Sequence, residues 1–158
     1  EICAHFKGSG WLIFSSEPDR KYKARVANQI EFSHVIRHFK RFAVEFEMQP
    51  FGYDIFEQMI TKTAPFSLFN IGTFEAEPII TIFGNGNITL YVNSQSNFLK
   101  DITDKVIIDS EMKNAYNNSV SLNYKMNGDF PVLSLGENNI SWVGDITKLE
   151  IQPNWRWL

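Results

Sequence analysis

Alternation of apolar and polar residues is the main pattern in the first third of the chain. Residues 42–48 read Phe-Ala-Val-Glu-Phe-Glu-Met, which places the larger apolar side chains on one face of a strand and both glutamates on the other. Residues 11–14 and 22–26 predict two further strands, and Glu-Pro-Asp-Arg at 17–20 has the chemistry of a turn between them. Residues 2–6, followed by Lys-Gly-Ser-Gly, predict the end of a helix closed by glycine. This part is expected to be β-rich, with a short helical remnant.

From residue 74 onward, short apolar runs recur at intervals of roughly ten residues, as in an antiparallel sandwich or barrel. The runs 79–83 and 88–92 flank Gly-Asn-Gly-Asn, whose Asn-Gly pair predicts a tight hairpin. The runs 139–143 and 147–151 are separated in the same way by Gly144-Asp145, a predicted turn. No stretch after residue 60 keeps helical periodicity over eleven positions. We therefore predict a mainly β chain that ends in an antiparallel β-sandwich.

Composition divides the chain into two predicted units. Residues 1–53 hold eight Lys+Arg and six Asp+Glu (net +2), whereas residues 54–158 hold seven against twelve (net −5). Thirteen asparagines fall from Asn70 onward and only one precedes them. These shifts predict a first domain at 1–53, a linker at 54–64 and a sandwich domain at 65–158.

Charge and hydropathy argue against two large classes of function. The 158 residues carry a net charge of −3 without a basic block, so the phosphate neutralisation that nucleic-acid binding requires is missing. The longest apolar stretches, such as 78–83, are far shorter than the roughly 20 residues that span a bilayer. The single cysteine, Cys3, cannot form an internal disulfide, which favours synthesis in a reducing compartment.

Candidate metal and nucleophile sites are weak. His34 and His38 have the spacing of two metal ligands on one helix face, but they lie between strand-like runs and no third ligand has suitable spacing. Cys3 and His5 have no third group to orient them, so an inert buried thiol is the better interpretation. We expect no metal and no cofactor.

Three carboxylate pairs are candidates for the acid and base of glycoside hydrolysis. Each lies in a segment rich in turn-forming residues, where acidic side chains usually shape loops. We therefore expect these carboxylates to shape loops and not to act in catalysis. The sequence also has no phosphate-binding loop or nucleophile motif, so the chain is not expected to be an enzyme. The pairs are Asp101 with Asp104, Asp109 with Glu111, and Glu75 with Glu77.

Tryptophans offer a candidate saccharide site. In the final segment Trp155 and Trp157 are expected on one face of the chain, with Arg156 on the other face. Indole rings can stack on the apolar face of a sugar. Trp142 lies in an apolar run and is expected to fill the core, and a terminal aromatic pair commonly closes a sandwich. Core packing is thus favoured over sugar stacking for all three.

The order of motifs along nearly the whole chain resembles the distal tail proteins of siphophages and prophages. The first part resembles the later part of the ring-forming N-terminal domain, and the second resembles the C-terminal domain of that family. The motifs that carry the resemblance are Gly10–Phe14, Pro18-Asp19, Tyr22–Arg25, Phe42–Phe46, Gln49–Phe51, Glu77–Gly84, Ile107–Glu111, Gly128–Pro131, Leu135–Ile140 and Pro153–Leu158.

The resemblance implies a structural hub. In that family six copies form a ring through their N-terminal domains, and each C-terminal domain is a β-sandwich of the galectin or carbohydrate-module (jelly-roll) type. Residues 11–53 would carry ring contacts, and residues 65–158 would contact tail-tip or receptor-binding proteins. The ring joins the tail tube to the baseplate, so the chain would be made in the bacterial host cytoplasm and reside at the virion tail tip. A saccharide-binding adhesin is the alternative.

The resemblance also bears on the beginning of the chain. Glu1 stands where an initiator methionine would be expected, and the ring domain of the family has strands that correspond to nothing in this sequence. The chain is therefore expected to start partway through that domain, with an incomplete ring-forming unit.

Overall fold

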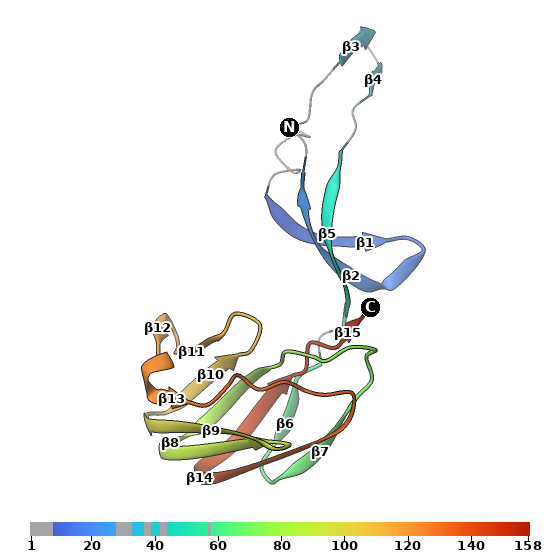
Figure 1. Ribbon diagram of the computed structural model, residues 1–158. Coiled ribbons are helices and arrows are strands. Elements are labelled where there is room, and N and C mark those ends of the chain that lie inside the picture. The colour runs from blue at the N-terminus through green and yellow to red at the C-terminus, as the bar shows by residue number, and fades with distance from the viewer. Residues whose placement is uncertain (1–7, 28–32, 37–38, 42–43, 57) are drawn as a thin grey trace. The chain divides into compact units, whose positions relative to one another are not determined.

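The computed structural model describes residues 8–27, 33–36, 39–41, 44–56 and 58–158 (Figure 1). Within these residues the chain is built from β-strands and one short 3-10 helix. It forms two compact units, Glu1–Ile55 with Leu158, and Phe56–Trp157. The described residues include no helix long and apolar enough to cross a membrane.

The first unit contains an antiparallel sheet in which β2 (Glu17–Val26) lies between β1 (Ser9–Phe14) and β5 (Phe46–Asp54). β3 (Ser33–Ile36) and β4 (Phe39–Arg41) form a separate antiparallel pair. The strands expected at 11–14 and 22–26 are confirmed. The helix end expected at residues 2–6 lies outside the described residues.

Two predictions for the first unit are wrong. The turn lies at Ser15-Ser16, and Glu17 already belongs to β2. Pro18 has no backbone N–H to donate to a neighbouring strand. It is tolerated in β2 because it lies where the register shifts, between the pairs Leu12↔Tyr22 and Phe14↔Glu17.

The strand expected at 42–48 begins instead at Phe46 and continues to Asp54. Phe42 and Ala43 lie outside the described residues. The face expected to be buried is open, because Phe46 and Met48 remain 39% and 43% exposed.

The second unit is a nine-stranded antiparallel sheet. β8 and β14 are its two longest strands, and the other strands flank them on both sides (Figure 1). The nine strands are β6 (Ile60–Lys62), β7 (Phe66–Asn70), β8 (Ile79–Val92), β9 (Gln95–Ile102), β10 (Lys105–Asp109), β11 (Asn114–Asn117), β12 (Val120–Ser121), β13 (Met126–Asn127) and β14 (Gly136–Gln152). The unit also contains the 3-10 helix η1 (Asn123–Lys125) and the short strand β15 (Arg156–Trp157), which lies outside this sheet.

Both expected turns in this unit are wrong, because β8 and β14 each run through the predicted break. They pair with each other on both sides of it, from Ile79↔Gln152 to Val92↔Ile140. The first half of β8 pairs on its other edge with β10, and the second half with β9. Two four-strand layers, β10-β8-β14-β6 and β9-β8-β14-β7, thus share the long strands.

Glycine is required where the long strands bend because their backbones approach closely. A Cβ on Gly84 would lie 2.1 Å from the carbonyl oxygen of Asp145, and one on Gly144 would lie 2.7 Å from that of Asn87. The two asparagines of the same stretch hold the next loop. Asn87 Oδ1 accepts a hydrogen bond from the Asp101 N–H, and Asn85 Oδ1 accepts one from the Asp104 N–H, each at 3.0 Å.

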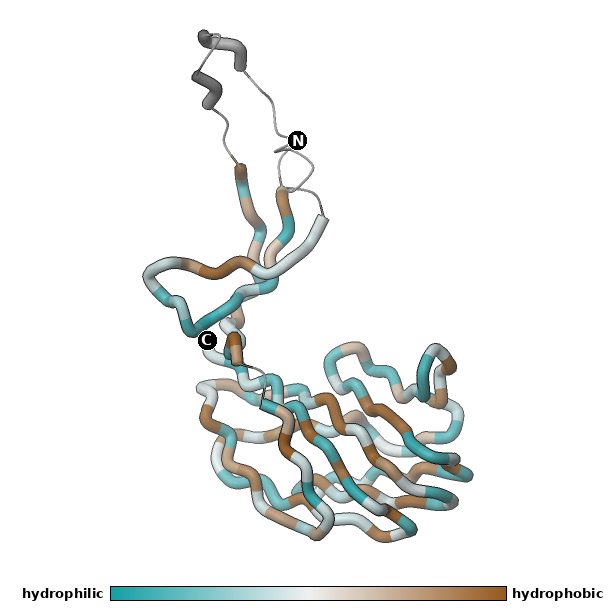
Figure 2. The backbone as a smooth tube through the Cα atoms, turned by 180° about the vertical axis from the view of Figure 1, so that it is seen from behind, coloured by the Kyte–Doolittle hydropathy of each residue, from teal (hydrophilic) through white to brown (hydrophobic). Residues whose placement is uncertain are grey.

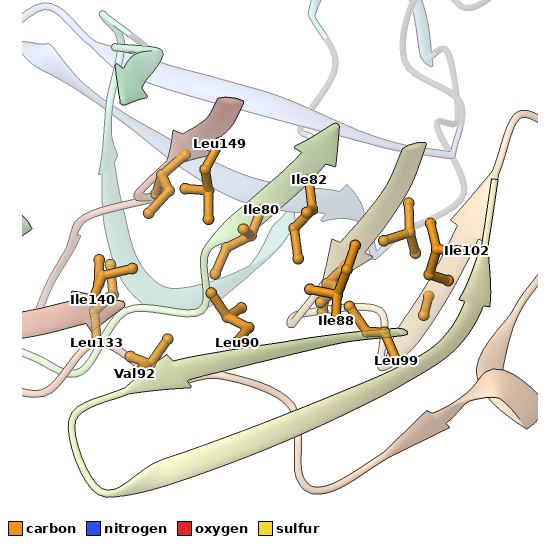
Figure 3. Packing of buried hydrophobic residues seen from close by; sticks show 14 of the residues in the cluster. Ile80, Ile82, Ile88, Leu90, Val92, Leu99, Ile102, Leu133, Ile140 and Leu149 are labelled. Atoms are coloured by element: carbon orange, nitrogen blue, oxygen red, sulfur yellow. The ribbon is translucent and has the colours of Figure 1, made fainter. Parts of the chain in front are cut away.

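A single hydrophobic core fills the second unit. Alternate residues of β8 point into it, and they meet side chains from β9, β10, β14 and the loop before β14 (Figure 3). The alternation of apolar and polar residues along these strands is visible in Figure 2. Each fully buried aliphatic side chain contributes about 1.5–3 kcal/mol to folding. The largest of them are Ile80, Ile82, Ile88, Leu90, Leu99, Ile108, Leu133, Ile140, Leu149 and Ile151.

The predicted fold class is confirmed in its main terms, since the described chain is mainly β and its sheets are antiparallel. The closer likeness to a galectin or carbohydrate-module jelly roll stays a prediction.

Candidate interaction surfaces

The first unit has little core of its own among the described residues. Only Ala24 and Tyr53 are buried hydrophobic residues there, whereas the second unit buries sixteen in one cluster. Large apolar side chains of the first unit are exposed instead. They are Trp11, Ile13, Phe14, Phe46 and Met48. Because such side chains favour removal from water, this sheet has the character of an interaction surface.

One face of this sheet carries an aromatic-basic cluster, formed by Trp11, Lys21, Lys23 and Tyr53. The register places Trp11 opposite Lys23 and Lys21 opposite Tyr53. The two rings meet edge to face, with centroids 5.3 Å apart. Lys21 Nζ lies 4.7 Å and Lys23 Nζ 5.4 Å from the Trp11 ring centroid. Each such contact is worth about 0.5–1 kcal/mol at an exposed site, so the cluster holds a bulky ring and two cations in fixed positions.

A shallow hollow of about 740 Å³ adjoins this cluster. Its lining includes Trp11, Lys23, Arg25, Glu47 and Gln49. Arg25 Nη2 and Glu47 Oε2 lie 2.6 Å apart across it. Both side chains are well exposed, so this ion pair adds little to stability but fixes the two charges beside the tryptophan.

The opposite face is apolar. Phe14 contacts Tyr22 with ring centroids 5.6 Å apart, and Gly52 lies beneath the Tyr22 ring, where a Cβ would come within 3.3 Å of three of its atoms. Met48 and Phe46 pair with Ala24 and Val26 on β2, which places them on the same face as Tyr22. The first unit therefore presents two different surfaces, one aromatic and basic, the other apolar.

Tyr22 also makes the interaction that shifts its proton affinity. Its hydroxyl donates a 2.5 Å hydrogen bond to Glu17 Oε2. This hydrogen bond raises the pKa of Tyr22, with smaller contributions from burial and from the negative charge of Glu17. The protonated phenol is favoured by folding, so its contribution to stability is present below the unfolded pKa near 10 and is lost as the pH rises through the higher folded pKa.

We expect Glu17→Gln to lower the pKa of Tyr22 toward its ordinary value, because the acceptor loses its charge. The phenolate absorbance of Tyr22, isolated by subtracting the titration of a Tyr22→Phe variant made in the same background, measures this shift. An unchanged midpoint in Glu17→Gln would show that the hydrogen bond does not control the group.

The tryptophans of the candidate saccharide site belong to the second unit. Trp155 is 9% exposed and forms part of the hydrophobic cluster, while Trp157 and Trp142 are half-buried and pack against it. Stacking on a sugar requires an open ring face. Saccharide stacking at Trp155 and Trp157 stays a prediction. The burial of Trp155 does not support it.

The carboxylate pairs shape loops or form ion pairs. Asp101 and Asp104 have positive φ angles in the loop after β9, and Asp109 Oδ1 accepts a hydrogen bond from the Met112 N–H at 2.8 Å. Glu77 lies 2.9 Å from both Lys113 Nζ and Arg156 Nη1, and Glu75 accepts a 2.6 Å bond from Arg156 Nε through its backbone oxygen. The structural role expected for the three pairs stays a prediction.

The described residues contain no group of three or more side chains able to hold a metal ion. His34 belongs to strand β3, and His38, Cys3 and His5 lie outside the described residues. The ring contacts were expected only somewhere within residues 11–53, and the Trp11 cluster was not predicted. Lys21 and Lys23 share a face because they lie two residues apart, but only the register of β2 with β1 and β5 brings Trp11 and Tyr53 to them.

Comparison with known proteins links this chain to a solved structure through its fold. No family model matches the sequence, and no curated protein matches it. The crystal structure of SPP1 Dit, described as a paradigm of the hub adsorption apparatus in phages that infect Gram-positive bacteria, matches with a TM-score of 0.66 and 15% sequence identity. The match covers 95% of this chain and 65% of that structure, so this chain spans about two thirds of its length. The predicted resemblance to a distal tail protein is thereby confirmed at the level of the fold.

Proposed function

We propose that this chain is a structural component of a phage tail tip. In the full-length protein it forms a hexameric hub that joins the tail tube to the baseplate or host-recognition apparatus. The observation that carries the proposal is the fold match to a hub protein over 95% of the chain, which takes in both units.

The surfaces of the first unit support a ring. A head-to-tail ring requires that each subunit carry two different, complementary surfaces, because one surface of each copy contacts the other surface of the next. The aromatic-basic face around Trp11 and the apolar face around Met48 differ in this way. Few side chains are buried among the described residues of this unit, so association with another subunit would remove its exposed apolar side chains from water.

The second unit has the core that the first unit lacks, so it is suited to carry contacts without taking part in ring closure. Residues 65–158 form its main part and contact tail-tip and receptor-binding proteins in this proposal, as a sandwich of the galectin or carbohydrate-module type. The protein is made in the host cytoplasm and resides at the virion tail tip. This role uses no catalysis, no cofactor and no metal.

Met48→Asp in the full-length protein tests the ring surface. A charge at the centre of the apolar face opposes its burial between subunits, so the hexamer is expected to dissociate to monomers, at a cost of at least about 3 kcal/mol per interface. Sedimentation velocity measures the distribution of species.

Met112→Asp is the matched control, because Met112 is also exposed but belongs to the second unit. It should leave the hexamer intact, and circular dichroism should show the native β content in both variants. If Met48→Asp forms hexamers as readily as the control, the apolar face is not a ring contact. If the wild-type protein is a monomer at every concentration, the hub proposal itself is wrong.

A further inference from the structure

The outward face of β14, β8 and β9 in the second unit carries two rows of uncharged side chains. The register aligns Ser141, Tyr91 and Ser96 in one row, and Val143, Thr89 and Phe98 in the next. Neighbouring residues of β8 and β9, including Leu90, Val92, Asn97 and Leu99, are buried on the core side. The six aligned side chains therefore point away from the core, and the strands that carry them lie side by side (Figure 1).

Aromatic and aliphatic groups on this face are open. Tyr91 is 38% exposed, Phe98 40% and Val143 65%. Tyr91 and Phe98 are diagonal cross-strand neighbours, a relation in which Cα atoms are typically about 7–8 Å apart, so one ligand can touch both rings. We name this surface the Tyr91–Phe98 platform, formed by the six side chains of the two rows.

Charge is absent from the platform. None of its six side chains is ionisable at neutral pH. The nearest charged residues along the strands have opposite signs: Lys100, two residues after Phe98 on β9, and Asp145, two residues after Val143 on β14. The platform therefore suits a ligand that brings no net charge.

A neutral partner could be an apolar protein surface or a sugar, and the hydroxyl groups of the platform distinguish between these two. The side chains of Thr89, Tyr91, Ser96 and Ser141 make no hydrogen bond to any described residue of the chain, so four hydroxyls surround the rings with free donors and acceptors. An apolar protein surface pressed onto the platform would leave these hydroxyls without partners, which is unfavourable. A sugar presents both C–H faces for the rings and hydroxyl groups for the rim.

We propose that the Tyr91–Phe98 platform binds a neutral saccharide chain, with sugar rings stacked on Tyr91 and Phe98 and their hydroxyls bonded by Thr89, Ser96 and Ser141. This site is distinct from the terminal tryptophans, and it does not depend on ring assembly.

Binding of the intact chain to immobilised neutral hexasaccharides of glucose, galactose and N-acetylglucosamine tests the proposal, with polygalacturonate as the anionic comparison. Biolayer interferometry should detect at least one neutral hexasaccharide. Tyr91→Ala and Phe98→Ala should each weaken that binding about tenfold or more, because each removes a stacking surface. Tyr124→Ala removes an exposed tyrosine of the same unit from outside the platform, and it should bind as wild type does.

Ser96→Arg gives an independent variant, since it adds bulk and charge at an exposed position and removes no buried group. It should abolish binding while the thermal unfolding midpoint stays near the wild-type value. The proposal is overturned if no neutral hexasaccharide binds, if only polygalacturonate binds, or if Tyr91→Ala, Phe98→Ala and Ser96→Arg all bind as tightly as Tyr124→Ala. Loss of a protein partner by these variants without any saccharide binding would assign the platform to protein docking instead.

Discussion

Gly84→Ala is expected to destabilise the second unit by about 3 kcal/mol or more. The added Cβ would lie 2.1 Å from the Asp145 carbonyl oxygen and 3.1 Å from the Ile146 Cα. Both are backbone atoms of β14, so relief of the clash requires separation of the two longest strands. Thermal unfolding followed by circular dichroism should show a midpoint lower by more than about 10 °C.

Gly86→Ala provides the matched control two residues further along β8. Its Cβ would meet nothing within 4 Å, and the cost is limited to the positive φ of 77° at that position, about 1 kcal/mol. If both variants lose the same small amount of stability, β8 and β14 do not approach at Gly84 as described, and two separate hairpins would account better for the sequence.

Asn138→Ala is expected to cost about 3 kcal/mol or more, because Asn138 is fully buried and holds the start of β14 in place. Its Nδ2 donates to the carbonyl oxygens of Ser134 and Gly136 at 2.9 and 3.0 Å. Its Oδ1 accepts from the Ser134 N–H and from Asn93 Nδ2, both at 2.8 Å. Alanine removes these four hydrogen bonds, each of which contributes about 0.5–1.5 kcal/mol to stability.

Asn139→Ala is the natural comparison, since the adjacent asparagine is exposed and its side chain accepts one bond, from Ser67 Oγ at 2.7 Å. Its effect should stay within about 0.5 kcal/mol. Urea denaturation of both variants measures the difference. Equal losses would mean that the buried network around residue 138 does not contribute as its geometry suggests.

The strands themselves could be predicted from the sequence, but their continuity could not. The short apolar runs at 79–83 and 88–92 are strand, as expected. The stretch between them reads equally well as a hairpin or as a bend, because both need glycine. The choice is made by pairing with residues about 50 to 70 positions away, as in Val92↔Ile140 and Ile79↔Gln152. The local sequence does not indicate that pairing.

Burial was harder to predict than strand position. The alternation around Phe46 and Met48 shows that one face is apolar but not whether anything covers it, and among the described residues that face is open. The adjacent asparagines 138 and 139 are chemically identical, and only the register turns the first inward. Trp155 and Trp157 share a parity in the sequence, yet Trp155 is embedded in the core cluster while Trp157 only packs against it.

The candidate surfaces depended on the same tertiary information. Lys21 and Lys23 could be placed on one face because they lie two residues apart, but Trp11 and Tyr53 join them only through the register of β2 with β1 and β5. Tyr91 falls in the predicted run 88–92, but no strand was predicted around Phe98. The position of both rings on one uncharged face follows from the pairing of β8 with β9.

The hub proposal is tested most directly by the mass and symmetry of the full-length protein in solution. Native mass spectrometry should give a species of six subunits, and negative-stain electron microscopy of the same sample should show closed sixfold rings. A monomer at all concentrations, or an open polymer without closed rings, would contradict the proposal.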